Sequence, residues 1–595
     1  MDPQRIPQAY WRQRLRMARA MGLNTVFSYV FWNELEPARG RWDFSGRNDV
    51  ARFFRIADEE GLKVVLRPGP YVCGEREWGG FPAWLMMATG GGGDEPVRVR
   101  EDNGPFLEAS RRYLRRLGAE LRDLQATRGG PVLMVQLENE YGSFGSDKKY
   151  LQALADMLRE SFDLRLYTND GDNKANLENG QLHGVLAETD GDPRQGFAAR
   201  DKYVTDKTSL GPQLDGEYYV TWFDDWSASS GHHAAPGNGA AVDKALDGLE
   251  WVLRGNNSFS IYMFHGGTNW GFGNGAIWAN GRTMAVTSSY DYGAPLDESG
   301  RPTEIYFKLR AMISKYVPAG SIPEVPKTPP LIDIKEFSLK PARPLFDTRS
   351  RQPDKRSSQP ATMESLAQSY GFVLYEHKVA EDASGILSPG DEPRDRVMVY
   401  VNGKRVGVVD RTYVTPAKVR LSLKRGDTLQ LLVENLGRVD FTHKLKDQRK
   451  GIVGNVSLGS GRVLEGWSMY SLSLDALPPG IFTNSQVVVR DEQPPVFYTA
   501  SFRLPAGSKT GFESDTFLSL PRGTKGQVWV NGINLGRYWA VGPQQSLYLP
   551  GCYLKTAGQP NEVVVLELEP RASAPPSAKG ISVRQWFNSP DPDAP

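Results

Sequence analysis

Residues 131–142, Pro-Val-Leu-Met-Val-Gln-Leu-Glu-Asn-Glu-Tyr-Gly, decide how the N-terminal half of this chain folds. The apolar run from Val132 to Leu137 predicts a buried strand, which stops abruptly at acidic and amide side chains. In an α/β barrel the loops beyond the carboxyl ends of the strands build the active site. Glu140 is therefore a candidate catalytic residue, although a lone glutamate after a strand is more often a surface ion-pair residue.

A second segment, residues 215–222, places the carboxyl group of Glu217 among aromatic side chains in the order Asp-Gly-Glu-Tyr-Tyr-Val-Thr-Trp. Retaining glycoside hydrolysis needs one protonated carboxyl that donates to the leaving oxygen and one ionised carboxylate that attacks the anomeric carbon. We interpret Glu140 as the proton donor and Glu217 as the nucleophile. Asn139 fits the role of holding a sugar hydroxyl, and a turn residue or helix cap is an equally good interpretation of it.

Short apolar strands alternate with amphipathic helices from the start of the chain to about residue 317, which predicts a parallel sheet. The number of units favours a closed barrel over a doubly wound sheet. We expect helices at 10–21, 48–60, 106–125 and 303–316, and strands at 24–31, 63–67, 132–137, 164–168, 217–220, 258–264 and 285–289. Because the first element is already a helix, the strand that would precede it in a (β/α)8 barrel is missing.

The second half of the chain has a different texture. Residues 318–360 are rich in Pro, Lys, Arg and Ser and predict a linker. Beyond them, Asn402-Gly403 and Asn531-Gly532 are hairpin-turn signals between short strands. We therefore expect a catalytic domain at 1–317, the linker, and then a β-sandwich at 361–480, a second β-sandwich of jelly-roll type at 481–570 and a flexible tail at 571–595.

Composition and charge exclude several classes of function. The formal charge is +1, from 71 basic and 70 acidic residues, so no nucleic-acid partner is indicated. No run approaches the roughly 20 apolar residues of a membrane-spanning helix, so no membrane partner is expected. The six histidines and two cysteines show no metal-ligand spacing, so we expect no metal and no cofactor. The oligomeric state stays open.

The segment after a third predicted strand, residues 63–67, also contains a candidate sugar-binding carboxyl group. The rigid turn Pro68-Gly69-Pro70 presents Glu75, whose carboxylate can accept two sugar hydroxyls. Aromatic residues recur at the strand ends, and stacking of sugar C–H faces on their rings would explain this, although core packing is the weightier interpretation of any single one. They are Tyr29, Trp32, Tyr71, Tyr219, Trp222, Tyr262, Trp270 and Tyr292.

At these segments the sequence strongly resembles the β-galactosidases of glycoside hydrolase family 35. The resemblance covers nearly the whole chain and rests on many motifs in the same order. They are Tyr-Val-Phe-Trp-Asn at 29–33, Glu-Pro at 36–37, Arg-Pro-Gly-Pro-Tyr at 67–71, Gly-Gly-Phe-Pro-Ala-Trp-Leu at 79–85, residues 136–142, residues 217–226, Tyr-Met-Phe-His-Gly-Gly-Thr-Asn at 262–269, Ser-Tyr-Asp-Tyr at 289–292 and residues 530–539.

The resemblance implies an eight-stranded catalytic barrel followed by β-domains, a retaining mechanism and a small-molecule or oligosaccharide substrate with terminal β-galactose. It places the proton donor on Glu140 and the nucleophile on Glu217. It places galactose contacts, those of Cys73 and Gly74 through backbone groups, on Tyr29, Cys73, Gly74, Glu75, Asn139, Tyr219, Tyr262 and Tyr292.

This chain departs from the family pattern at the pocket rim and at its start. Thr221 and Ser227 stand where family members usually have Gly, Gly74 where Ala is frequent, and Arg76 where Trp is frequent. The family's first barrel strand lies just upstream of a segment like Arg-Ile-Pro at 5–7, so we expect a truncated chain whose full form would carry any secretion signal. The resemblance points to an extracellular, vacuolar or lysosome-like compartment, whereas the first residues lack the apolar core of a signal peptide.

Two alternatives stay open. One is a same-mechanism exo-glycosidase for another sugar, such as a β-glucosaminide. The other is a carbohydrate-binding protein in which the catalytic pair is present but inactive because the first strand is missing.

Overall fold

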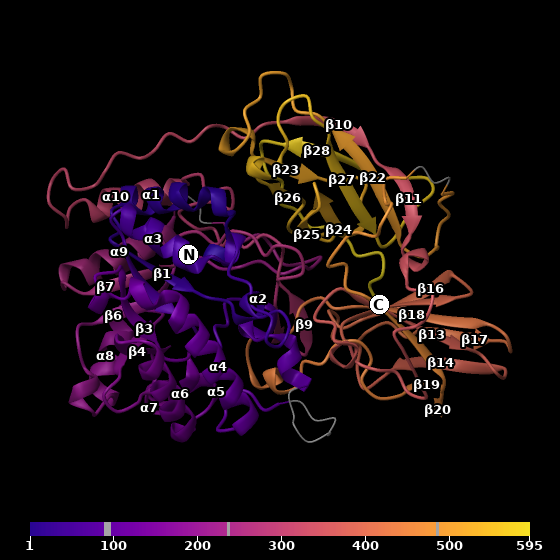
Figure 1. Ribbon diagram of the computed structural model, residues 1–595, viewed down its shortest axis with the longest axis horizontal. Coiled ribbons are helices and arrows are strands. Elements are labelled where there is room, and N and C mark those ends of the chain that lie inside the picture. The colour runs from indigo at the N-terminus through magenta and orange to yellow at the C-terminus, as the bar shows by residue number, and fades with distance from the viewer. Residues whose placement is uncertain (88–96, 235–238, 484–486) are drawn as a thin grey trace.

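Parallel strands in the order β1 to β7 form a 7-stranded sheet in which each strand pairs with the next along the chain. The computed structural model describes residues 1–87, 97–234, 239–483 and 487–595. The sheet curves into a nearly closed barrel that occupies the indigo and magenta part of the molecule (Figure 1). Its strands are β1 Thr25–Tyr29, β2 Lys63–Arg67, β3 Val132–Gln136, β4 Arg165–Gly171, β5 Leu186–Asp190, β6 Leu214–Tyr219 and β7 Ser258–Tyr262.

The helices follow the apolar spacing of the sequence. In α3, for example, Phe53 and Phe54 are fully buried against the sheet, and the Asp49 side chain caps the helix by accepting from the Arg52 amide at 3.0 Å. The helices are α1 Trp11–Met21, α2 Trp32–Leu35, α3 Val50–Glu59, α4 Gly104–Leu121, α5 Tyr141–Phe144, α6 Lys148–Ser161, α7 Lys174–Gly180, α8 Pro193–Tyr203, α9 Ala240–Arg254 and α10 Glu304–Ile313.

The barrel has an open seam between β1 and β7, which are not paired with each other. The first two residues run along part of this seam. The Met1 amino group donates to the Phe27 carbonyl at 2.9 Å, and the Asp2 carboxylate accepts from the Tyr29 amide at 3.1 Å. These contacts satisfy backbone groups of β1 that a neighbouring strand would otherwise bind.

The expected barrel strands need two corrections. Residues 285–289 were expected to form the last barrel strand, but they do not join the barrel: β8 Ala276–Ala279 and β9 Arg282–Ala285 form a separate 2-stranded antiparallel hairpin. Conversely, β5 was missed. Its apolar part is short and runs directly into Glu188, Thr189 and Asp190, so it lacks the long apolar run by which the other strands were recognised.

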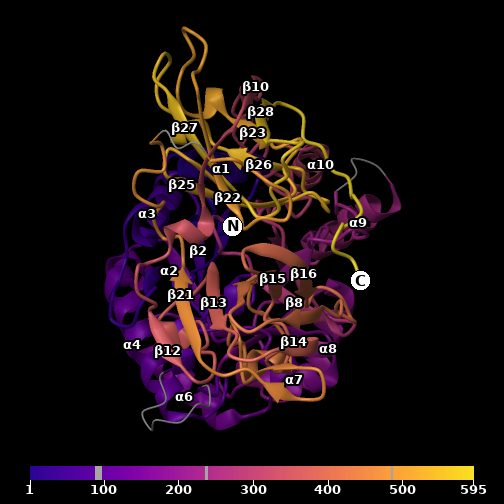
Figure 2. The same cartoon turned by 90° about the vertical axis from the view of Figure 1, so that its right-hand side faces the viewer.

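Two all-β domains follow, each built from two sheets, and they lie side by side along the barrel (Figures 1 and 2). The first has sheets in the orders β12-β21-β13-β18-β15-β16 and β17-β14-β19-β20. Its strands are β12 Lys355–Ser357, β13 Phe372–Lys378, β14 Ala383–Pro389, β15 Arg396–Val401, β16 Lys404–Asp410, β17 Arg420–Leu423, β18 Thr428–Glu434, β19 Val456–Leu458, β20 Arg462–Val463 and β21 Trp467–Leu472.

The second β-domain has sheets in the orders β10-β28-β23-β26 and β11-β22-β27-β24-β25. Its strands are β10 Ile334–Ser338, β11 Lys340–Pro344, β22 Val496–Phe502, β23 Thr516–Ser519, β24 Lys525–Val530, β25 Ile533–Trp539, β26 Ser546–Leu549, β27 Asn561–Glu567 and β28 Ser577–Ile581.

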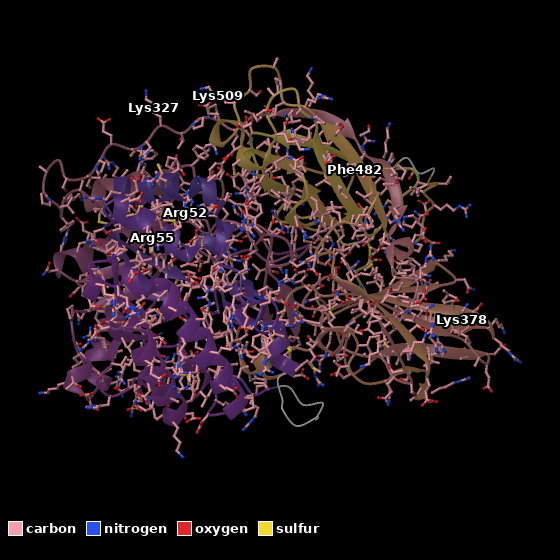
Figure 3. All side chains as sticks on the ribbon, in the orientation of Figure 1. Arg52, Arg55, Lys327, Lys378, Phe482 and Lys509 are labelled. Atoms are coloured by element: carbon pink, nitrogen blue, oxygen red, sulfur yellow. The ribbon has the colours of Figure 1, made fainter. Side chains whose placement is uncertain are left out.

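The segment expected to be a linker, residues 318–360, takes part in both β-domains. Its first portion is extended and crosses from the barrel with Lys327 pointing outward (Figure 3). It then supplies β10, β11 and β12, each of which is the edge strand of its sheet. Edge strands tolerate Pro and Lys, so the same composition that predicts a linker also suits a sheet edge.

The expected flexible tail, residues 571–595, is likewise built into the structure. It provides β28, an inner strand of its sheet, and Arg584, which pairs with Asp291 of the barrel domain at 2.7 Å. The fold class predicted from the sequence, a parallel α/β barrel followed by β-rich domains, is confirmed, with seven strands in a nearly closed barrel. Within the described ranges no helix has the length and apolarity required to cross a bilayer.

Candidate active site

The carboxyl ends of the barrel strands bring the candidate residues together. Tyr29 ends β1, Tyr219 ends β6 and Tyr262 ends β7, while Asn139 and Glu140 follow β3 directly. Because the strands are parallel, these ends meet at one mouth of the barrel.

Glu217, on β6, lies among hydrogen-bond donors and is nearly buried. The Tyr29 hydroxyl lies 2.8 Å from its Oε1, and the Tyr219 hydroxyl donates to its Oε2 at 2.8 Å. The guanidinium group of Arg67, at the end of β2, forms an ion pair with Oε1. Donors and a positive charge favour the ionised carboxylate.

Glu140 has a different environment. It is half-buried, and the contact to its Oε2 is a long one, from Asn139 Nδ2 at 3.5 Å. Burial, followed by the nearby negative charge of Glu217, raises the pKa of Glu140 to about 8. The carboxyl group is therefore protonated at neutral pH.

Asn139 lies between the two carboxyl groups. Its Oδ1 accepts from Arg67 Nη2 at 2.8 Å and from Gln136 Nε2 at 2.8 Å, and the Tyr29 hydroxyl is 2.9 Å away. These contacts fix the amide so that its Nδ2 faces Glu140. A fixed amide of this kind can donate to a hydroxyl of a bound sugar.

Glu138 stabilises the turn after β3 through buried hydrogen bonds. Arg100 binds both of its carboxylate oxygens at 2.8 Å, and the Tyr150 hydroxyl donates to Oε1 at 3.0 Å. Arg100 also donates to the Asn139 carbonyl at 2.7 Å. Glu138 therefore holds the turn that carries Asn139 and Glu140.

Several candidate residues have left-handed backbone conformations that non-glycine residues rarely adopt. Glu140 has φ 46°, Cys73 φ 56°, Glu75 φ 45° and Tyr292 φ 63°. Such conformations cost on the order of 1–3 kcal/mol each and persist where the surroundings enforce them, typically at functional sites. Their concentration here marks these loops as specialised.

The loop after β2 carries Cys73, Gly74 and Glu75. The Tyr290 hydroxyl donates to Glu75, and Cys73 Sγ lies 3.9 Å from Glu75 Oε1. Burial is the largest cause that raises the pKa of Glu75, to about 7, while the Tyr290 hydrogen bond opposes it. A Cβ added to Gly74 would come 3.8 Å from the Tyr262 hydroxyl, so this loop borders the tyrosines.

The expected tyrosines form one aromatic cluster. The ring of Tyr262 lies 6.3 Å from that of Tyr29, 5.8 Å from that of Tyr219 and 5.4 Å from that of Tyr292. The Tyr262 hydroxyl is also 3.1 Å from that of Tyr290. The structure thus brings Tyr29, Tyr219, Tyr262 and Tyr292 together in one cluster.

A metal was not expected, and one group of side chains has a geometry that a metal could use. Ligand atoms of Cys73, Glu75 and Asp440 lie within 4.8 Å of one another. Burial, and then the charges of Asp440 and Glu75, raise the pKa of the Cys73 thiol well above its usual value. A thiol binds metal as a thiolate, so metal binding here would require the Cys73 thiol to lose its proton.

Sequence reasoning missed several residues of the site. Arg67 was seen only as part of a motif, and Tyr290 was not singled out. Asp190 lies on the missed strand β5, where burial, followed by the charges of Glu140 and Glu217, raises its pKa well above the usual value. A signal existed for Arg67, since an arginine that ends an apolar strand needs an acidic partner at the barrel mouth. Asp190 offered none beyond its own short strand.

Comparison with known proteins places this geometry in a family. Residues 1–316 match the model described as glycosyl hydrolases family 35. Residues 360–473 match the first all-β domain of β-galactosidase, and residues 495–561 match a model described as its galactose-binding domain.

Curated relatives match along most of the chain. A β-galactosidase of Xanthomonas manihotis is 38% identical over 554 residues, covering 92% of this chain and 87% of the relative. The Bos taurus β-galactosidase is 37% identical over 588 residues, which cover 95% of this chain and 86% of the relative. The Homo sapiens β-galactosidase is 38% identical over 590 residues, which cover 95% of this chain and 83% of the relative.

Proposed function

This chain belongs to glycosyl hydrolase family 35, and from that premise we propose how its residues hydrolyse a β-galactoside. The protein is a glycoside hydrolase that removes β-galactose. Its substrate is a small-molecule or oligosaccharide β-galactoside. We assign catalysis to the barrel domain of residues 1–317, with Glu140 as acid and base and Glu217 as nucleophile.

The difference between the two carboxyl environments carries this assignment. Glu217 accepts from Tyr29 and Tyr219 and pairs with Arg67, which favours a carboxylate ready to attack. Glu140 has a raised pKa of about 8 and so holds a proton at neutral pH. A pair of carboxyl groups with opposite protonation states is the arrangement that double displacement requires.

In the first step the Glu217 carboxylate attacks the anomeric carbon while Glu140 donates its proton to the departing glycosidic oxygen. The galactosyl group is then covalently bound to Glu217, and Glu140 is ionised. In the second step Glu140 takes a proton from water, which attacks the anomeric carbon and releases galactose with its original β configuration. Both carboxyl groups return to their starting states.

We propose that galactose lies against the tyrosine cluster, with Glu75 accepting its hydroxyls and Asn139 donating to one beside the anomeric carbon. Backbone groups of Cys73 and Gly74, together with Tyr29, Tyr219, Tyr262 and Tyr292, complete the pocket. Interactions of this kind accelerate the reaction only where they strengthen in the transition state. The half-exposed Trp222, whose ring is 5.4 Å from that of Tyr219, is available at the rim for stacking.

The stereochemistry of the first product tests this mechanism. Proton NMR during hydrolysis of an aryl β-galactoside should show β-galactose first and α-galactose only later, by mutarotation. Early α-galactose would show inversion and contradict a nucleophilic role for Glu217. The alternatives, a non-catalytic sugar-binding protein and an exo-glycosidase for another sugar, are not favoured, because the curated relatives along this chain are β-galactosidases.

A further inference from the structure

The loop that follows β18 in the first β-domain, residues 435–440, is interlocked with the barrel loop that carries Glu75. We call residues 435–440 the β18 loop. The Arg438 amide donates to Glu77 Oε2 at 2.7 Å, and its buried guanidinium group pairs with Glu77 and with Glu364. The Trp78 amide donates back to the Arg438 carbonyl at 3.4 Å.

The backbones of the two domains also approach each other closely. The Ala276 amide donates to the Arg438 carbonyl at 3.0 Å, and the Asp440 amide donates to the Ala276 carbonyl at 2.9 Å. A Cβ on Gly437, which has φ 124°, would lie 2.7 Å from the Gly275 carbonyl oxygen, so only glycine fits there. The β18 loop therefore has a fixed position relative to the sugar-binding loop.

This loop delivers Asp440 to the pocket wall. The Asp440 carbonyl accepts from the Tyr71 hydroxyl at 2.6 Å, and the residue is completely buried. One of its carboxyl oxygens lies within 4.8 Å of ligand atoms of Cys73 and Glu75, yet neither oxygen has a hydrogen-bond partner. An unpartnered buried carboxylate is costly, so this group needs a functional explanation.

The groups around Asp440 decide which carboxyl carries the charge. The Glu75 carboxyl group accepts a hydrogen bond from the Tyr290 hydroxyl, and the positive charge of Arg5 favours its ionised form. The Arg5 guanidinium group also donates to the Gly74 carbonyl. Asp440 has no such donor, and burial followed by the charge of Glu75 raises its pKa well above the usual value. Two carboxylates this close cannot both ionise without a large penalty.

We propose that Asp440 is a positioning residue of the galactose pocket: its buried side chain, supplied by the β18 loop, supports Cys73 and Glu75 in their sugar-binding geometry. This inference rests on the proposed function, because it assumes that Glu75 binds galactose. The neutral acid fills the space behind Glu75 without adding a second negative charge. The first β-domain thereby contributes to sugar binding by the barrel.

Galactose binding across pH tests the proposal. Dissociation constants for free galactose are measured by calorimetry from pH 5 to pH 10 with the wild type, Asp440→Asn and Asp440→Ala. Asp382→Asn, at an exposed residue of the same domain that pairs with Lys424, is the matched control. Thermal unfolding of each variant establishes that it folds.

Asparagine has the shape of the neutral acid, so Asp440→Asn should bind like the wild type, within about twofold, at acidic and neutral pH. At alkaline pH the wild type ionises Asp440 beside Glu75 and should weaken, whereas Asp440→Asn should not, giving about a tenfold difference at pH 10. Asp440→Ala should bind about tenfold more weakly at every pH, because the support is lost. The other groups that face Asp440, namely Cys73, Glu75, Tyr71 and Arg5, are common to all variants.

Three results would overturn the inference. Wild-type affinity in Asp440→Ala would show that Asp440 does not position the pocket. Equal weakening of Asp440→Asn at every pH would show that an ionised Asp440 is needed. A divalent metal bound stoichiometrically to the wild type, lost in Asp440→Ala and required for binding, would make the cluster a metal site. If the wild type neither binds galactose nor hydrolyses a β-galactoside, the proposed function itself fails.

Discussion

The ends of β3 and β6 carry one carboxyl group each, and their surroundings are opposite. At the end of β6, Glu217 meets hydroxyl donors and the Arg67 cation. Beyond β3, Glu140 has a long contact to Asn139 and a pKa raised to about 8 by burial and by Glu217. The two residues have the same side chain, and their neighbours give it different chemistry. The hydrogen-bond donors around each carboxyl group therefore determine which is the nucleophile and which is the acid.

Removing the nucleophile should have the largest effect. In Glu217→Gln the amide cannot attack the anomeric carbon, so kcat/KM for a chromogenic β-galactoside should fall about 10⁵-fold. Exposed Glu178 on α7, which pairs with Lys174, provides the control, and Glu178→Gln should retain wild-type activity. Comparable rates for Glu217→Gln and the wild type would show that Glu217 is not the nucleophile.

Removing the acid should have a large effect that depends on the leaving group. Glu140→Ala should slow hydrolysis of alkyl galactosides and disaccharides about 10⁴-fold, because their leaving oxygens need a proton. Activated aryl galactosides should lose far less in the glycosylation step. Paired rate measurements on the two substrate classes check this, and equal losses would mean that Glu140 is not the acid.

Glu138 and Glu140 are two residues apart, yet Glu138 should act through the stability of the turn and not as a catalytic group. Glu138→Ala leaves the buried Arg100 guanidinium unpaired, which should cost about 3–5 kcal/mol in the unfolding of the barrel. Thermal or denaturant unfolding measures this, with Glu178→Ala expected within about 0.5 kcal/mol of the wild type. A stable Glu138→Ala variant would show that the turn is held by other contacts.

Arg67 links the two strand ends, since its Nη2 reaches both Asn139 and Glu217. Arg67→Lys keeps the charge but cannot bind both oxygens in the same way, so kcat/KM should fall about 10²-fold. Arg52→Lys, on the exposed face of α3 (Figure 3), is the matched control and should be silent. An unchanged rate in Arg67→Lys would mean that charge alone prepares Glu217.

The pH dependence should reflect the raised pKa of Glu140. The acid form is present below about pH 8 and is lost as the pH rises through that value. For a substrate with a poor leaving group, kcat/KM should therefore fall about tenfold per pH unit above pH 8. A pH–rate profile measures this, and the alkaline decline should disappear in Glu140→Ala. Persistence of the same decline in that variant would assign it to another group.

The sequence predicts the periodic parts of this fold well. Helices α1, α3, α4 and α10 lie close to their expected ranges, because their apolar residues recur along one face. Strand β5 was missed because polar residues follow its short apolar start. The segment of the edge strands β10 to β12 was predicted to be a linker from its Pro, Lys, Arg and Ser content. It forms strands because it pairs with β28, β22 and β21, which lie far away in the sequence.

The same limit applies to the site. Glu140, Asn139 and Glu217 stand out because each follows or ends an apolar strand with an unusual polar residue. The roles of Arg67 and Tyr290 depend on which side chains they meet at the barrel mouth. Asp440 is the extreme case, since it comes from another domain and no local pattern connects it to Glu75. Its position depends on the packing between the domains.

Trapping the covalent intermediate tests the division of roles most directly. A 2-deoxy-2-fluoro-β-galactoside with an activated leaving group slows the second step, so the galactosyl group should remain bound to the protein. Peptide mass spectrometry of the inactivated enzyme should find the added sugar on Glu217, while Glu140 stays unmodified. A label on Glu140, or steady turnover without any labelled peptide, would contradict the account.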